Sequence, residues 1–286
     1  MTKTATLLID CPDRKGLVVA ILNFLVAQYD VNILNADQHQ DTELGLFFMR
    51  VEFATDVSLC NTAGFAEAFE PLAIGLKLNW RIEFAETRQR VALFVSQYMH
   101  CLADLLDRYQ TEEFRCELAM IVSNHESARR LAEFHGIPFH YMPMTRETRP
   151  EVEAQQVTLL QENGMDLVVL ARYMQILSAK FVDAFPRRII NVHHSFLPAF
   201  TGAKPYHAAF ARGVKLIGAT AHYVTPELDE GPIIEQDVER ISHADSPEVL
   251  VAKGRDIERR VLARAVALHV EDRVLLNGTK TVVFRD

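Results

Sequence analysis

The sequence predicts two domains, a small α+β domain followed by a larger α/β domain with a mostly parallel sheet. The chain has 286 residues, 49% of them hydrophobic, which is enough for more than one buried core. The first eighty residues follow the order βαββαβ, and from about residue 90 short apolar strands alternate with helices. We therefore expect one domain over residues 1–85 and a second over residues 90–286.

The strands of the first domain are predicted by apolar residues at every second position, and its helices by apolar residues that recur about every 3.6 residues. The resulting unit is a small antiparallel sheet with both helices on one face, which leaves its other face and its edges available for pairing with a second copy. We expect a homo-oligomer, a dimer or a tetramer. The expected elements are a strand at Thr4–Asp10, a helix at Lys15–Tyr29, strands at Asn32–Gln40 and Leu44–Phe53, a helix at Asn61–Gly75 and a strand at Lys77–Phe84.

The second domain begins with continuous apolar strands, which predict a sheet that helices cover on both faces. Its expected strands are Val91–Ser96, Cys116–Ser123, Pro138–Tyr141, Asp166–Leu170, Ile189–His193, Leu216–Val224 and Ile233–Glu239. Its expected helices are His100–Tyr109, Glu126–His135, Glu151–Asn163, Ser178–Phe185 and Pro247–Val270, followed by a closing pair of strands near Val274 and Val283. In such sheets, ligands bind outside the carboxyl ends of the strands.

Composition and charge exclude several classes of partner. A net charge of −8 argues against a nucleic-acid partner, because phosphate backbones are held by clustered Lys and Arg. The most apolar run, Leu17–Ala27, contains Asn23 and is much shorter than the ~20 residues of a membrane span, so we expect no membrane partner. Four scattered cysteines favour free thiols, and we expect a cytoplasmic protein.

The densest set of chemically active residues is N-V-H-H-S-F-L-P, which begins at Asn191 at the end of an apolar strand. Residues two apart on a strand share a face, so Asn191 and His193 project together while His194 points elsewhere. An amide donor and an imidazole are therefore presented side by side at the end of a sheet. A single His in a strand is also a common core residue, so this motif alone leaves both interpretations open.

A second motif, H-Y-V-T-P-E-L-D-E-G-P-I-I, runs from a strand with His222 into an acidic turn before Gly231. We expect a raised pKa for a carboxylate in this turn, which would suit acid–base chemistry, although an acidic turn is also a common solvated loop. Metal-assisted hydrolysis through His193, His194, His222 and Asp229 is an alternative. It is disfavoured because adjacent strand residues face opposite sides and no H-E-x-x-H spacing occurs. We expect no metal and no cofactor.

Together with L-A-R-Y-M-Q-I-L at residues 170–177, these motifs resemble the folate-dependent formyltransferase family over roughly residues 90–240. The resemblance implies a Rossmann-like fold and a catalytic triad of Asn191, His193 and Asp229. Gln175 departs from the family pattern, because transferases of this family often have Arg there. The resemblance also implies a folate substrate, bound by Met174, Gln175, Leu177, Pro226 and Glu227.

The segment C-P-D-R-K-G-L-V-V-A, which begins at Cys11, and N-I-L, which begins at Asn32, resemble an ACT domain of ferredoxin-like fold. The free N–H groups at the start of the first helix suit a small carboxylate ligand, and Gly16 permits a close backbone approach. The resemblance implies a small amino-acid effector bound by Asp13, Gly16, Asn32 and Ile33. A purely structural dimerisation domain is the alternative.

An ACT domain followed by a formyltransferase-like domain is similar to the formyltetrahydrofolate deformylase family. This implies hydrolysis of 10-formyltetrahydrofolate to tetrahydrofolate and formate, which supplies formate for purine synthesis. The loop after the first strand of the catalytic domain, Val95–Leu102, has no glycine, so backbone N–H groups cannot easily converge on a phosphate. Water is therefore the expected acceptor, and His100 would orient it or pack as an ordinary helix-start residue. Formyl transfer to glycinamide ribonucleotide, and a folate sensor without turnover, are the alternatives.

Overall fold

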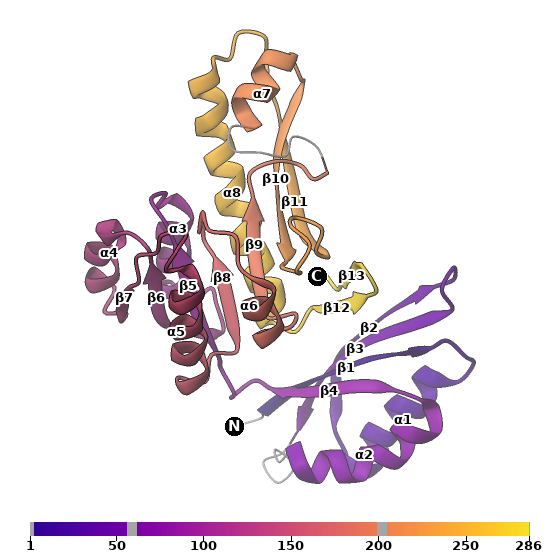
Figure 1. Cartoon of the computed structure of the whole chain (residues 1–286). Helices are drawn as coiled ribbons and strands as arrows, with labels where there is room; N and C mark the ends of the chain where they lie inside the picture. Colours follow the sequence, from indigo (N-terminus) through magenta and orange to yellow (C-terminus); the bar gives the residue numbers. More distant parts are fainter. Residues whose placement is uncertain (1–2, 56–61, 199–204, 286) are drawn as a thin grey trace. The chain divides into compact units, whose positions relative to one another are not determined.

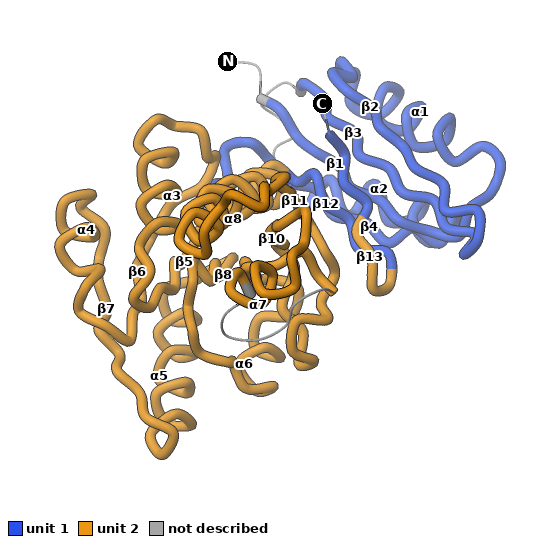
Figure 2. Tube along the Cα trace, turned by 90° about the horizontal axis from the view of Figure 1, so that it is seen from above, with its two compact units in different colours: residues 1–88, 272–277, 282–286 blue, residues 89–271, 278–281 orange. Residues whose placement is uncertain are grey.

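The computed structural model describes residues 3–55, 62–198 and 205–285 and divides into two compact units. Figure 1 shows the elements of each unit, and Figure 2 colours the units separately. Unit 1 comprises Met1–Arg88, Asp272–Asn277 and Val282–Asp286; unit 2 comprises Gln89–Glu271 and Gly278–Thr281. The chain thus leaves unit 1 close to the expected boundary. The expected second domain runs to residue 286, whereas in the structure Asp272–Asn277 and Val282–Asp286 belong to unit 1.

Unit 1 is a four-stranded antiparallel sheet, in the order β2-β3-β1-β4, with two helices on one face (Figure 1). The predicted start of α2 at Asn61 lies outside the described residues. The first helix was expected to begin at Lys15 and begins at Leu17. Gly16, which precedes it, has a left-handed conformation with φ 90°. The elements are β1 (Lys3–Pro12), α1 (Leu17–Tyr29), β2 (Asn32–Asp41), β3 (Leu46–Thr55), α2 (Thr62–Leu76) and β4 (Asn79–Phe84).

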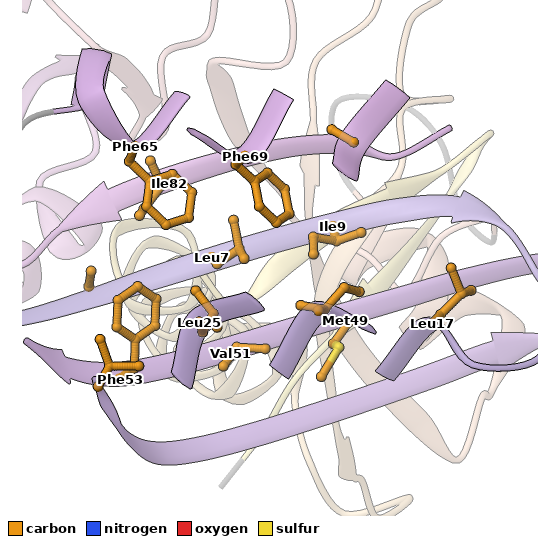
Figure 3. Packing of buried hydrophobic residues seen from close by; sticks show 14 of the residues in the cluster. Leu7, Ile9, Leu17, Leu25, Met49, Val51, Phe53, Phe65, Phe69 and Ile82 are labelled. Atoms are coloured by element: carbon orange, nitrogen blue, oxygen red, sulfur yellow. The ribbon is translucent and has the colours of Figure 1, made fainter. Parts of the chain in front are cut away.

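The core of unit 1 follows from strand alternation. Leu7 and Ile9 of β1 face the helices, and Figure 3 shows them with Phe69 of α2 and Leu25 of α1. The intervening Leu8 faces the opposite side. There it packs in a second cluster, whose buried members are Leu8, Phe48, Leu275 and Phe284.

This second cluster corrects the expectation that the face of the sheet opposite the helices is open. The cluster draws on the C-terminal hairpin of β12 (Val274–Asn277) and β13 (Lys280–Val283). Polar contacts also hold this segment, because Arg50 Nε donates to the carbonyl of Asp272 at 3.1 Å. Part of that face is therefore covered by the chain's own C-terminal segment.

Unit 2 is built on a seven-stranded sheet in the order β11-β10-β9-β8-β5-β6-β7. The pairs among β5 to β9 are parallel and the pairs β9/β10 and β10/β11 are antiparallel, which confirms the mostly parallel sheet. Its strands are β5 (Gln89–Val95), β6 (Cys116–Ser123), β7 (Phe139–Tyr141), β8 (Leu167–Leu170), β9 (Ile189–His193), β10 (Leu216–Tyr223) and β11 (Ile233–Arg240).

Both faces of this sheet are covered. Ala92 and Phe94 pack with Leu160 and Phe181 on one face, while Leu93 is buried on the other. Helix α7 is an element that the sequence pattern did not predict. None of the described helices is long and apolar enough to cross a membrane. The helices are α3 (His100–Gln110), a 3-10 turn (Glu126–Ala128), α4 (Arg129–Phe134), α5 (Arg149–Glu162), α6 (Ala179–Ala184), α7 (Pro205–Arg212) and α8 (Pro247–Val270).

Candidate active site

A pocket in unit 2 lies where the loops after β8 and β10 meet the end of β9. The carboxyl ends of β5, β8 and β9 are adjacent in the sheet, which is where this class of fold binds ligands. The cavity volume is about 280 Å³, close to the lower limit of roughly 300 Å³ for small-molecule sites. All eight predicted triad and folate residues line it: Asn191, His193, Asp229, Met174, Gln175, Leu177, Pro226 and Glu227.

The orientation of the Asn191 side chain is set by His222 on the neighbouring strand. The two residues are cross-strand partners in the β9/β10 pair, so their side chains lie on the same face. His222 Nδ1 lies 2.9 Å from the carbonyl oxygen of Tyr223, which can only accept, so Nδ1 carries the proton. Burial lowers the pKa of His222, which favours the neutral ring. Its Nε2 therefore accepts from Asn191 Nδ2 at 3.3 Å.

Asp229 reaches the same place from the loop between β10 and β11. Its Oδ2 lies 3.3 Å from Nδ1 of His193, and its Oδ1 lies 3.8 Å from Nε2 of His222. Asp229 has φ 59°, a left-handed conformation that Asp tolerates better than most residues. A Cβ at Gly231 would lie 1.7 Å from the carbonyl oxygen of Tyr223, so glycine is required where this loop returns to the strand. The backbone conformation of the L-D-E-G-P motif therefore positions the carboxylate of Asp229 in the pocket.

The expectation of a raised pKa for a carboxylate in this turn is wrong for Asp229, whose pKa is lowered. The hydrogen bond from His193 has the largest effect, and it outweighs the opposing effect of burial. The charges of nearby His193, His222 and His194 act in the same direction. Asp229 is therefore ionised at neutral pH, and His193 is held by a carboxylate.

His194 does not point away from the site, as strand alternation predicted. It follows the last residue of β9, so the alternation ends before it. Its ring centroid lies 5.1 Å from that of His193, and both residues line the pocket. His193 keeps one buried nitrogen, Nε2, that has no hydrogen-bond partner among the described residues. A buried donor or acceptor without a partner is costly, which suggests that a ligand satisfies it.

The opposite side of the pocket is apolar and exposed. Met174, Ile176 and Leu228 are 46%, 58% and 61% exposed, which is unusual for large apolar side chains and suits an aromatic ligand. Gln175 Oε1 accepts from the Arg149 guanidinium at 3.3 Å. An arginine from α5 thus reaches the loop at the position where transferases of the resembled family often carry one.

The geometry does not favour metal chemistry at the predicted His and Asp residues. In the part of the chain that the structure describes, three metal-ligand atoms come within 4.8 Å of one another only at His100, Cys101 and Glu258. There, Glu258 already accepts from His100 and from Tyr206. Burial raises the pKa of the Cys101 thiol, and the Arg172 cation is adjacent. This donor set is therefore unsuited to a cation.

The four predicted effector residues of unit 1 do not come together within one chain. Asp13 and Gly16 follow the end of β1, where the Gln40 side chain donates to Asp13. Asn32 lies opposite Ala54, which pairs with Thr4 at the other end of β1. Nine residues separate Thr4 from Asp13, about 30 Å along a strand. Ile33 is next to Asn32, so the four residues form two separate pairs.

Comparisons with known proteins show the family to which this chain belongs. The family model "Formyl transferase" matches residues 89–266, which contain every residue of the pocket. A formyltetrahydrofolate deformylase of Synechocystis is 51% identical over 98% of this chain and 98% of its own length. The two proteins therefore correspond over both units.

Solved structures extend the comparison to the fold. A formyltetrahydrofolate deformylase from Pseudomonas syringae superposes with a TM-score of 0.96 at 48% identity, and the match covers 100% of this chain and 95% of that one. A glycinamide ribonucleotide transformylase from Symbiobacterium toebii is 30% identical with a TM-score of 0.65, and the match covers 69% of this chain and 95% of that one. The chain belongs to the formyltransferase family and, within it, to the formyltetrahydrofolate deformylases.

Proposed function

We propose that this protein is an enzyme that hydrolyses 10-formyltetrahydrofolate to tetrahydrofolate and formate. One observation carries the proposal: Asn191, His193 and Asp229 converge on a pocket whose other wall is apolar. Amide and imidazole donors beside an ionised carboxylate suit attack on a carbonyl carbon. The sequence identity to deformylases over nearly the whole chain supports the same reaction.

In the proposed reaction, water attacks the formyl carbon and the carbonyl oxygen becomes an oxyanion. Asn191 Nδ2 has a second hydrogen besides the one donated to His222, and a protonated His193 offers Nε2–H; both bind the oxyanion. Asp229 takes a proton from the water and passes it to the folate nitrogen as the carbon–nitrogen bond breaks. Formate and tetrahydrofolate leave, so atoms and charge balance without a cofactor.

Supporting this assignment, Asp229 has a carboxylate oxygen that is available to water. Its Oδ1 is 3.8 Å from His222 Nε2, beyond hydrogen-bond distance, while Oδ2 holds His193. The exposed apolar side chains of Met174, Ile176 and Leu228 would cover the aromatic part of the folate. The cavity volume suits the ring and its formyl group rather than the whole extended substrate.

The test is a formate-release assay on the purified chain with 10-formyltetrahydrofolate, run with and without glycinamide ribonucleotide. The proposal predicts stoichiometric formate and a rate unchanged by the amine. Formyl loss that requires the amine would instead identify a transferase. Binding of folate without formate release would identify a sensor.

We further propose that unit 1 is an ACT domain that regulates the enzyme and pairs with a second copy. Its βαββαβ order and its exposed edge strand β2 support this assignment. Within one chain, Asp13 and Gly16 lie far from Asn32 and Ile33. If the β2 edges of two copies pair antiparallel, one pair from each copy would lie close together. An amino-acid effector would then contact all four residues at the interface between the copies. The test is sedimentation and formate release by the full chain with glycine or methionine, compared with Asp13→Ala.

The proposed metabolic role follows from the product. Formate release returns tetrahydrofolate to the folate pool and supplies formate for purine synthesis. A strain that depends on formate from this reaction should lose purine prototrophy when the gene is removed and recover it on added formate. Failure of formate to rescue growth would argue against this role.

A further inference from the structure

Helix α5 has an unusual inward face, because two of its three buried side chains are polar. The buried residues are Glu153, Gln156 and Leu160, and the two polar ones are only 5% and 0% exposed. Spaced three and four residues apart, they lie on one side of the helix. A helix normally turns apolar residues toward the core, and a carboxylate is rarely buried without a partner. The two polar residues therefore need partners inside the domain.

Their partners lie between β8 and α6, in residues 171–178, a stretch that we call the wall segment because it lines one side of the pocket. Gln156 Nε2 donates to the Tyr173 hydroxyl at 3.2 Å. Glu153 Oε1 accepts from the backbone N–H of Ser178 at 3.3 Å. The two buried polar residues of α5 thus hold the wall segment at two separate points.

Between these two points, side chains of the wall segment face the pocket and the helix in turn. Met174 and Ile176 line the pocket and are 46% and 58% exposed. The side chain of Gln175, which lies between them, is turned back to α5, where it accepts from the Arg149 guanidinium at 3.3 Å. Large apolar side chains in contact with water favour a rearrangement that buries them. Hydrogen bonds to α5, rather than apolar packing, therefore keep these two side chains facing the pocket.

The end of β5 fixes only the first part of the wall segment. The Ser96 N–H donates to the Arg172 carbonyl at 3.3 Å, and the Ser96 hydroxyl accepts from the Met174 N–H at 3.0 Å. Beyond Met174, the hydrogen bonds of the wall segment among the described residues go to α5 and, at Ser178, to the start of α6. The conformation of this second part therefore depends on α5.

We propose that Glu153 and Gln156 are positioning residues that hold the wall segment in its folate-binding conformation. This inference rests on the proposed function, because it takes a folate to be the ligand of the pocket. Neither residue is among the described residues that line the pocket, so both act through the wall segment. Their effect falls on folate affinity and not on the bond-breaking step, in which Asn191, His193 and Asp229 act.

The test is the affinity for tetrahydrofolate, measured by calorimetry, together with the Michaelis constant and kcat of formate release. Glu153→Leu removes the acceptor for the Ser178 N–H, and Gln156→Leu removes the donor to the Tyr173 hydroxyl; both keep the approximate size of the side chain. Each should weaken tetrahydrofolate binding and raise the Michaelis constant by roughly 5–10-fold, the effect of about one hydrogen bond, while kcat changes less than about twofold.

Conservative variants separate positioning from a general loss of structure. Glu153→Gln keeps an oxygen that can accept from the Ser178 N–H, so it should recover most of the affinity. Tyr173→Phe removes the same hydrogen bond as Gln156→Leu and keeps the ring contact with Phe94, so it serves as the test if the leucine variants do not fold. Because both changes act on one bond, the double variant should bind tetrahydrofolate no more weakly than either single variant.

Glu151→Leu and Gln155→Leu are the matched controls, because these residues are exposed on the same helix and the changes in size and charge are the same. Both should bind tetrahydrofolate as the parent does. If folded Tyr173→Phe and the folded leucine variants at Glu153 and Gln156 bind like these controls, or lose kcat at unchanged affinity, the proposal is overturned. A parent that binds no tetrahydrofolate would refute the proposed function as well, so the two failures are distinguishable.

Discussion

Two carboxylates in unit 2, one partly buried and one fully buried, differ in how much of their hydrogen-bonding capacity the protein uses. Asp229 lies on a loop, is 18% exposed and has one oxygen within hydrogen-bond distance of His193. Glu258 lies on a helix, is 2% exposed and has both oxygens bonded within 2.8 Å. Both have a lowered pKa, so charge alone does not separate them. The difference lies in how the two oxygens are used: Asp229 Oδ1 has no donor within hydrogen-bond distance among the described residues and can bind a water, whereas each oxygen of Glu258 already accepts a hydrogen bond from a protein side chain.

The largest effect is expected at Asp229. Asp229→Asn keeps the size of the side chain and removes the basic oxygen, so kcat should fall by ~10²–10⁴-fold, the usual contribution of a general base. Folate affinity should change little. Formate release and folate binding measure the two effects separately. Glu230→Gln is the control, because Glu230 is exposed and lies next to Asp229; comparable losses in both variants would contradict the assigned role.

Asn191→Ala should cost ~10²–10³-fold in kcat, the usual effect of removing one oxyanion donor. The loss should leave the Michaelis constant nearly unchanged, because the donor acts on charge that develops in the transition state. Steady-state formate release checks both constants. A variant that raises only the Michaelis constant would place Asn191 in ground-state folate binding instead.

His222 should show a smaller effect, since it acts through Asn191. His222→Asn can still donate to the Tyr223 carbonyl but lacks an acceptor at the Nε2 position, which costs about one hydrogen bond and roughly 3–10-fold in kcat. His222→Gln places a carbonyl oxygen near that position and should recover most of the rate. If the two variants are equally slow while folded, the orienting role is wrong.

The comparison also explains what the sequence could predict. Asn191, His193 and His222 lie on strands that local apolar patterns predict, and short motifs were enough to single out the three proposed catalytic residues that line the pocket. Glu258 could not be singled out, because in the sequence it is one polar residue of a long amphipathic helix. Its hydrogen-bond partners Tyr206 and His100 lie 52 and 158 positions earlier in the chain. The pKa of Asp229 was mispredicted for a similar reason: the turn suggested burial, whereas the neighbouring imidazole across the site dominates.

A third carboxylate, that of the partly buried Asp272 in unit 1, differs from both because its partners do not compensate for burial. Its Oδ1 lies 3.7 Å from the Arg81 guanidinium, and its own carbonyl, rather than its carboxylate, accepts from Arg50. Burial raises the pKa of Asp272 to about 7, and the Glu83 charge acts in the same direction. Between pH 3.8 and about 7 the folded chain holds a proton that the unfolded chain has released. Stability from this group therefore falls as pH rises through that window.

Asp272→Asn is neutral at every pH, so it should lack this decline. Relative to the parent, its melting temperature should be higher at pH 8 than at pH 5, by about 2–4 °C for roughly 1 kcal/mol. Glu83→Gln removes the neighbouring negative charge, so it should make the parent's loss of stability between pH 5 and pH 8 smaller, though not as small as in Asp272→Asn. Thermal melts of the full chain at the two pH values measure this difference. A profile of Asp272→Asn parallel to that of the parent would show that Arg81 compensates Asp272 as fully as His100 and Tyr206 compensate Glu258.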